Sequence, residues 1–236
     1  MTRLVRNLLV GCLLVLTAIP ALADGDQPIE ALRKGVEEGL RILNNPEFRD
    51  ADRKEAQQHK LRIILEQLFD FREFSRRVLA SNWKNFTPSQ RDEFVRVFTE
   101  FLGKFYMGKV QEKYRDERLN YVGQEMKSAT QALVNIEVVW RGQEIPVDLW
   151  MIKREGMWKI YDIQVLGISA VRNYRAQFKS LLSKETPAQV IQRIKDKIRE
   201  IDSEKQNSSV PNNRSRLTSF LQTEYYEFNL TPRLTR

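Results

Sequence analysis

The feature that most constrains the fold is a change in hydrophobic periodicity near Leu119. Before this residue, apolar side chains recur every three or four positions, which is typical of helices with one buried face. After it they recur at every second position as far as about Val165, which is typical of β-strands. The helical period returns after Gly167. This order of helices, strands and helices predicts an α+β fold.

The helical period also predicts where the individual helices lie. Pro46 ends the first helix, and Thr87 caps a helix that Pro88 opens, because threonine and proline are favoured at those two positions. That helix carries an unusually wide aromatic arc between Phe94 and Tyr114. The predicted helices cover residues 29–43, 61–68, a short segment through 74–78, 88–114, 171–181 and 187–201.

Three strands are predicted over residues 133–140, 144–153 and 157–165. Arg141-Gly142 and Glu155-Gly156 separate them and read as hairpin turns, so the sheet of about four strands should be antiparallel. In the last strand the apolar positions change phase beside Ile160, which indicates a β-bulge that curls the sheet. A curled sheet covered by aromatic helices can enclose a cavity.

The first residues resemble a secretory signal peptide. Arg3 and Arg6 precede an apolar run over residues 8–19 and an Ala-Leu-Ala triplet that ends at Ala23. The run is too short for a transmembrane anchor, which needs about 20 apolar residues. We therefore expect a cleavable leader over residues 1–23, export to the periplasm, a single domain over 24–202 and a flexible polar tail over 203–236.

Removal of the leader changes the chemistry that the chain can offer. The single cysteine, Cys12, leaves with it, so disulfides and thiolate sites are not expected. The leader takes two of the 39 basic residues and none of the 31 acidic ones, which leaves a net charge of +6. An exported protein seldom meets nucleic acid, so anionic lipid head groups or an acidic protein are the expected partners.

Five blocks of sequence, taken in order, resemble the MlaC (toluene-tolerance) family. They are Phe69-Asp70-Phe71, Trp83, the run from Thr87 to Phe94, the run from Gly156 to Ser169, and the run from Asn173 to Phe178. The resemblance covers roughly residues 29–201. It implies a periplasmic phospholipid-binding component of an ABC-transporter system, with no catalytic residues and no cofactor.

The resemblance further implies that helices and sheet clasp both acyl chains of a phospholipid and leave the head group near solvent, in a cone that resembles the nuclear-transport-factor-like fold. It implies traffic between an outer-membrane lipoprotein complex and an inner-membrane ABC transporter complex, which maintains outer-membrane lipid asymmetry. The expected rim for head groups or partners is Arg172, Arg175 and Lys179. The expected lipid-binding residues are Phe98, Leu102, Phe105, Tyr106, Val110, Trp140, Val147, Leu149, Met151, Ile163, Val165, Val171 and Tyr174.

Two other classes of function remain open from the sequence. An isomerase on a cone-shaped α+β fold would need an acid and a base that converge in an apolar pocket. The single histidine, His59, lies in a polar helical run. Neither Asp148 nor Asp162 is spaced from a Tyr or His in a way that would suggest an acid–base pair. Asp162 could equally be a buried acceptor for backbone amides. The third class is a periplasmic protein-binding adaptor, which co-purifying lipid would distinguish from a carrier.

Overall fold

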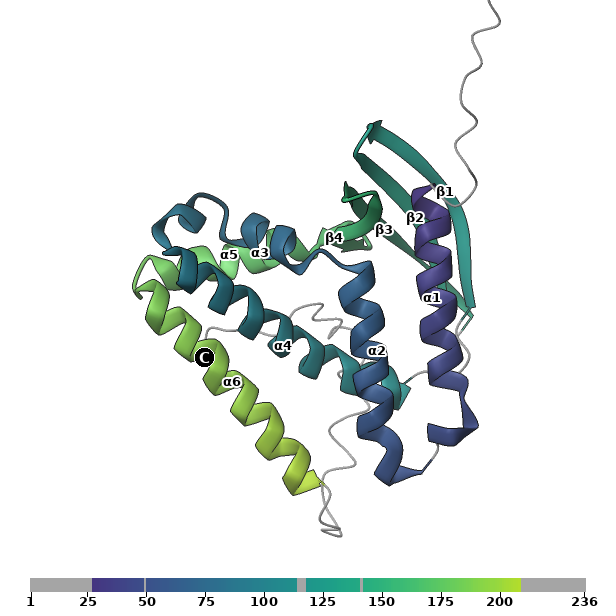
Figure 1. The fold of residues 1–236 in the computed structure, drawn as a ribbon, viewed down its shortest axis with the longest axis horizontal. Helices are drawn as coiled ribbons and strands as arrows, with labels where there is room; N and C mark the ends of the chain where they lie inside the picture. The colour runs from purple at the N-terminus through teal and green to yellow at the C-terminus, as the bar shows by residue number, and fades with distance from the viewer. Residues whose placement is uncertain (1–26, 49, 114–117, 141, 209–236) are drawn as a thin grey trace, which may run out of the picture.

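A computed structural model of the chain describes residues 27–48, 50–113, 118–140 and 142–208 (Figure 1). The predicted signal peptide and the tail from residue 209 lie outside the described residues. The helices are α1 (Pro28–Asn44), α2 (Lys54–Leu68), α3 (Phe71–Leu79), α4 (Pro88–Lys113), α5 (Ala170–Leu182) and α6 (Pro187–Ser208), with short 3-10 turns η2 (Pro46–Phe48), η3 (Ala51–Arg53) and η4 (Ala80–Asn85). The strands are β1 (Arg118–Ser128), β2 (Gln131–Trp140), β3 (Gln143–Arg154), β4 (Met157–Val165) and β5 (Ile168–Ser169).

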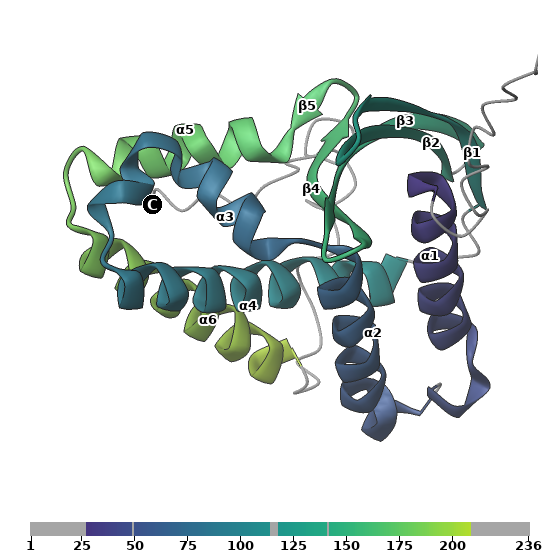
Figure 2. The same cartoon turned by 45° about the horizontal axis from the view of Figure 1, so that its top comes forward.

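The strands form one open antiparallel sheet in chain order, β1-β2-β3-β4-β5. Figure 2 shows it arching around the first half of α1. The predicted α+β class and curled antiparallel sheet are confirmed. The sheet has five strands where about four were predicted, because β5 is only two residues long and too short to give an alternating pattern.

The curl of the sheet depends on a bulge in β4. Trp150 pairs with Asp162 and Met151 pairs with Ile160, so Tyr161 is an extra residue on β4. The extra residue restores the phase, and the apolar side chains on either side of it face the same cluster. The hairpin before β4 turns through Glu155 and Gly156, at φ of 50° and 81°, which matches the twist of antiparallel strands. The predicted bulge is confirmed.

Side-chain caps fix the starts of two helices. The Thr87 hydroxyl accepts from the Gln90 backbone amide at 3.2 Å, and the Gln90 side chain accepts from the Thr87 amide at 3.0 Å. This reciprocal capping box opens α4. At α5, the Asp162 carboxylate accepts from the Ser169 hydroxyl at 2.6 Å and from the Val171 amide at 2.9 Å. Asp162 is therefore a structural acceptor that ties the start of α5 to β4.

The end of α6 differs from the sequence prediction. The helix continues to Ser208, past residue 203, at which the polar composition predicted the tail to begin. Lys104 on α4 contacts the carboxylate of Asp202 at 2.6 Å. Local composition cannot predict such a contact between segments that are distant in the sequence. Figure 1 shows α6 running alongside α4.

The buried apolar residues fall into two clusters. The helical cluster joins side chains of α3, α4, α5 and α6, and its centre is a set of aromatic rings on α3, α4 and α5. The sheet cluster joins the concave face of the sheet to Leu32 of α1. Partly buried Phe69, between α2 and α3, packs against both clusters. We call the region around Phe69, between the two clusters, the junction.

Candidate lipid-binding site

The junction is formed where the chain passes from α2 to α3. The Phe69 backbone forms a bridge with Ile160 of β4, and the Asp70 amide donates to the Ile160 carbonyl at 2.8 Å. The Asp70 carboxylate then caps α3 by accepting from the Glu73 amide at 2.8 Å. The Phe69 ring contacts those of Phe71 and Phe74, with centroids 4.8 and 5.5 Å apart. The Phe-Asp-Phe block therefore holds the two clusters in a fixed relation.

Apolar side chains around the two clusters are only partly buried. Tyr106 packs against the helical cluster, and Val138, Ile163 and Val165 pack against the sheet cluster, but none of the four is fully covered. A close-packed core would enclose such side chains. Incomplete burial leaves apolar surface that a ligand with a hydrocarbon chain can cover.

α2 adds apolar surface of its own. Ile63 and Leu65 are 43% and 38% exposed, which is unusual for large aliphatic side chains of a helix that packs against α1 and β4. The α1–α2 pair is itself tight, because a Cβ at Gly35 would lie 2.3 Å from the Leu68 side chain. The sequence analysis did not single out the α2 residues, since an amphipathic stripe does not reveal what covers it.

The predicted lipid-binding residues divide among three environments. Phe98, Leu102, Val171 and Tyr174 are buried in the helical cluster, and Val147, Leu149 and Met151 are buried in the sheet cluster. Phe105, Tyr106, Trp140, Ile163 and Val165 are partly buried. The Val110 side chain lies outside the described residues.

Alternation along β3 predicts that Val147, Leu149 and Met151 floor a cavity opposite the aromatic face of α4, which carries Phe98, Leu102 and Phe105, and the structure arranges them differently. The β3 side chains Leu149 and Met151 share the sheet cluster with Leu32 of α1, whereas the α4 rings belong to the helical cluster. The curl of the sheet directs its concave face toward α1. The participation of these residues in lipid binding stays a prediction.

The predicted basic rim lies on the exposed face of α5. Arg172 donates to the Gly167 carbonyl at 3.1 Å, and Arg175 donates to the Arg77 carbonyl at 3.0 Å. Lys179 is exposed on the same side. Beside Arg172, the turn between β4 and β5 carries Leu166, which is 60% exposed at a φ of 49°. Such a backbone is uncommon for leucine, so an apolar tip stands next to the basic face at some conformational cost.

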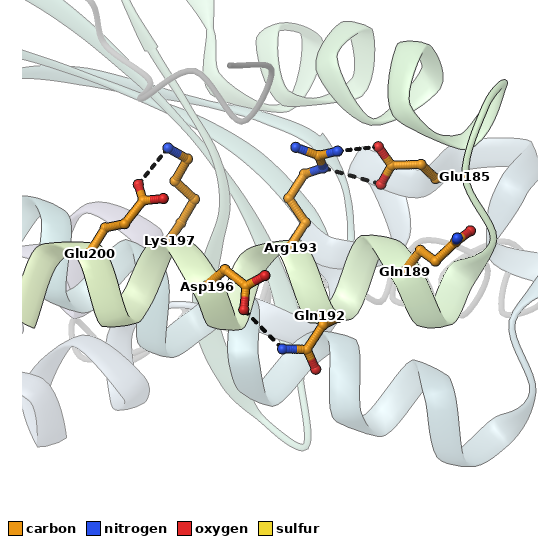
Figure 3. A pocket seen from close by; sticks show the side chains of 7 residues that line it. All are labelled: Glu185, Gln189, Gln192, Arg193, Asp196, Lys197 and Glu200. Carbon is orange, nitrogen blue, oxygen red and sulfur yellow. Dashed lines mark hydrogen bonds and ion pairs between the residues drawn. The ribbon is translucent and has the colours of Figure 1, made fainter.

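Two open grooves elsewhere are lined mostly by charged and amide residues. The groove along α6 in Figure 3 is lined by charged and amide side chains that pair with one another, including Arg193 with Glu185 and Lys197 with Glu200. A second groove of about 540 Å³ lies between α3 and the β3–β4 hairpin and is lined mainly by charged residues. Apart from Trp83 and Met157 in the second groove, neither groove is lined by apolar residues, whereas acyl chains require predominantly apolar walls.

Glu73 is the most buried charge in the second groove, with a side chain 3% exposed. Its carboxylate contacts Arg76 and Arg77, both at 2.7 Å, and Arg154 at 3.4 Å. Burial acts to raise the pKa of Glu73, but the hydrogen bonds and charges of Arg76 and Arg77 outweigh it and lower the pKa. Glu73 therefore holds α3 to the hairpin as a carboxylate.

Within the ranges that the structure describes, the two carboxylates considered as catalytic candidates serve as hydrogen-bond acceptors, and no metal-binding cluster occurs. No group of three or more His, Cys, Asp or Glu side chains could hold a metal ion there. Asp148 accepts hydrogen bonds from Asn135 at 2.7 Å and from Gln164 at 2.9 Å. Asp162 accepts a hydrogen bond from the Ser169 hydroxyl at the start of α5. Among the described helices, none is long and apolar enough to cross a membrane.

The family model described as MlaC protein matches residues 33–196. The chain belongs to the MlaC family. A phospholipid-binding protein from Ralstonia solanacearum, solved in complex with a phospholipid, has a similar structure, with a TM-score of 0.65 and 20% sequence identity. The match covers 75% of this chain and 99% of that protein. None of the curated proteins matches this chain. The predicted membership of the MlaC family is therefore confirmed.

Membership of the MlaC family supports lipid binding, and proteins of this family are in general periplasmic. The Phe69–Phe71 block lies inside the matched range, as do the bulge of β4 and the start of α5. The Phe69–Phe71 block, the bulge and the start of α5 therefore all lie in the part of the chain that matches the family model.

Proposed function

We propose that this protein is a periplasmic phospholipid carrier that covers the acyl chains of its cargo at the junction. The observation that carries the proposal is the set of partly buried apolar side chains at the edges of two separate clusters, Tyr106, Val138, Ile163 and Val165, in a chain of the MlaC family. The phospholipid bound by the Ralstonia protein of the same fold supports this choice of cargo.

The energetics of transport explain why such a carrier needs an apolar site and no chemistry. A phospholipid with about 30 methylenes, at roughly 0.8 kcal/mol each, loses on the order of 24 kcal/mol of hydrophobic stabilisation when it is exposed to water. A bilayer and an apolar site offer similar surroundings, so the free energy of transfer between them is small. Hand-over then depends on which partner the carrier meets.

In this proposal the carrier moves phospholipid between an outer-membrane lipoprotein complex and an inner-membrane ABC transporter complex, and so maintains outer-membrane lipid asymmetry. The exposed face of α5, with Arg172, Arg175 and Lys179, meets the lipid phosphate or an acidic surface of a partner. Its basic character matches either target, and charge complementarity of this kind chiefly accelerates association.

The deciding experiment is native mass spectrometry of the protein expressed in a bacterium and purified without detergent. We expect protein–phospholipid complexes, with the lipid released and identified after organic extraction. An enzyme of the isomerase type or a protein-binding adaptor would purify without lipid. A lipid-free protein that also fails to take radiolabelled phospholipid from vesicles would contradict the proposal.

A further inference from the structure

Two large aliphatic side chains lie exposed on the hairpin that joins β4 to β5. Leu166 is 60% exposed and Ile168 is 51% exposed. One exposed aliphatic side chain on a protein surface is ordinary, but two of them on a single turn form a small apolar patch. Figure 2 shows β5 where α5 begins, beside β4. We call Leu166, Gly167 and Ile168 the apolar tip.

The backbone of the apolar tip does not favour a leucine. Val165 pairs with Ile168, so Leu166 and Gly167 are the two central residues of the hairpin turn. Both have a positive φ, 49° and 80°. Two-residue hairpin turns of this kind prefer Asn, Asp or Gly at the first central position, because a larger side chain crowds the left-handed backbone. A leucine at this position therefore costs conformational energy.

The hairpin between β3 and β4 shows that the fold can make the same turn without a leucine. It turns through Glu155 and Gly156, at φ of 50° and 81°, and places an exposed charged residue at the first position. Packing within the chain does not explain Leu166 either, because most of its side chain lies in solvent. An exposed leucine in a strained conformation indicates a contact with something outside the chain.

Positive charge lies next to the apolar tip. Between Asp162 and Glu185 the chain has four basic residues and no acidic one. The Arg172 guanidinium donates to the Gly167 carbonyl at 3.1 Å, so one cation is fixed at the base of the tip. Spacings of three and four residues place the exposed basic side chains of α5 on one face, at Arg172, Arg175 and Lys179. The tip and this basic face therefore form one amphipathic surface.

The chemistry of this surface favours a lipid bilayer over a protein as its partner. Aliphatic side chains flanked by cations suit an anionic membrane, because the apolar groups reach the boundary of the acyl region while the cations meet phosphates. A protein interface of ordinary size buries about 800 Å² on each partner and needs a matching surface, which two side chains on a turn do not provide. A bilayer accommodates a narrow tip, since its lipids rearrange around it.

Resting on the proposed lipid carriage, we propose that the apolar tip and the basic face of α5 dock the protein directly on anionic bilayers. Leu166 and Ile168 enter the interfacial region, and the α5 cations hold the protein against the phosphate layer. The contact is weak and reversible, because even a whole myristoyl chain gives only marginal membrane binding. It brings the carrier to the membrane that supplies or receives its cargo.

The test is flotation of protein, purified without detergent, with vesicles of equimolar phosphatidylglycerol and phosphatidylcholine. Wild type should float with these vesicles at low salt, and much less at high salt or with phosphatidylcholine alone. Leu166→Asn should bind at least about fivefold more weakly, because apolar insertion is lost. The same variant should melt at the wild-type temperature or above, since asparagine is favoured in this turn, and should keep its lipid content after purification.

Val122→Asn is the matched control, because Val122 is also 60% exposed but lies on β1, at the opposite edge of the sheet. This variant should float like wild type. Wild type that stays unbound, equal flotation of Leu166→Asn, or an equal loss in Val122→Asn would each overturn the inference. Wild type that carries phospholipid in native mass spectra but does not float would leave the proposed function standing. Protein that neither carries phospholipid nor takes it from vesicles would instead contradict the proposed function.

Discussion

An arginine at position 163 should empty the protein of lipid without unfolding it. Ile163 and Leu149 are direct cross-strand partners on the concave face of the sheet, so their side chains are close neighbours. They differ in burial, since Leu149 is 4% exposed and Ile163 is only partly buried at the edge of the sheet cluster. The two substitutions therefore place the same charge at nearly the same site, once in a closed core and once at an open surface.

The expected loss of folding free energy is correspondingly larger for Leu149→Arg than for Ile163→Arg. Leu149→Arg loses about 2 kcal/mol of apolar burial and leaves an unpaired charge that costs about 3 to 5 kcal/mol more. The sum is comparable with the whole stability of a domain, about 5 to 15 kcal/mol. Ile163→Arg loses about 1 kcal/mol of burial, because its long side chain can bring the guanidinium to water. We expect insoluble Leu149→Arg protein and folded Ile163→Arg protein.

The assay is circular dichroism melting together with native mass spectrometry of protein purified without detergent. Ile163→Arg should melt about 3 °C below wild type and carry at least about tenfold less phospholipid, because a charge against acyl chains costs more than 1.4 kcal/mol. Val122→Arg, at a residue 60% exposed on β1, is the control and should match wild type in both measurements. A folded Ile163→Arg protein with its full lipid content would refute the placement of the site at the junction.

Three further outcomes are expected. Glu73→Gln should lower the free energy of unfolding by about 2 kcal/mol at neutral pH, against less than about 1 for Asp92→Asn at an exposed ion pair, by urea titration. Because the folded-state pKa of Glu73 is lowered, the contribution of its carboxylate to the free energy of unfolding should disappear in wild type as the pH falls below about 4.5. In the Glu73→Gln variant this pH-dependent contribution should be absent at every pH. Gly35→Ala should destabilise by about 1 to 3 kcal/mol through its clash with α2, whereas Gly39→Ala, with open space, should stabilise by up to about 1 in thermal melts. Arg175→Glu should slow lipid transfer between protein and anionic vesicles at low salt while the lipid content after purification stays unchanged.

Much of the fold follows from local sequence patterns. The change in period at Leu119, the capping box of Thr87 and the phase change beside Ile160 each specify one local geometry, and the structure contains all three. The packing of α1 inside the curl could not be predicted in this way. An apolar stripe shows that a helix is covered on one side, but the partner depends on how far the sheet bends.

The candidate site was predictable in its chemistry and less so in its position. Alternation in β3 identifies Leu149 and Met151 as inward residues, but inward side chains in a core and in a cavity wall give the same pattern. A cavity wall differs from a core in lying where the two apolar clusters do not merge. Where that happens depends on the whole fold. The Phe69-Asp70-Phe71 block lies at that position in the chain. Its role can be recognised only from the structure, in which Phe69 contacts both clusters.

Division of the interior into two clusters bears on how a carrier can release its cargo. If acyl chains lay within a single core, their departure would leave a large void, and voids destabilise by about 24 cal/mol per Å³. Here Phe98 and Phe178 pack against each other on one side, and Leu149 and Met151 share a cluster with Leu32 on the other. The backbone link between Asp70 and Ile160 keeps the two sides in register. Under the proposed function, loss of lipid therefore exposes junction side chains and leaves both cores intact, so the empty carrier stays folded and ready for the next molecule.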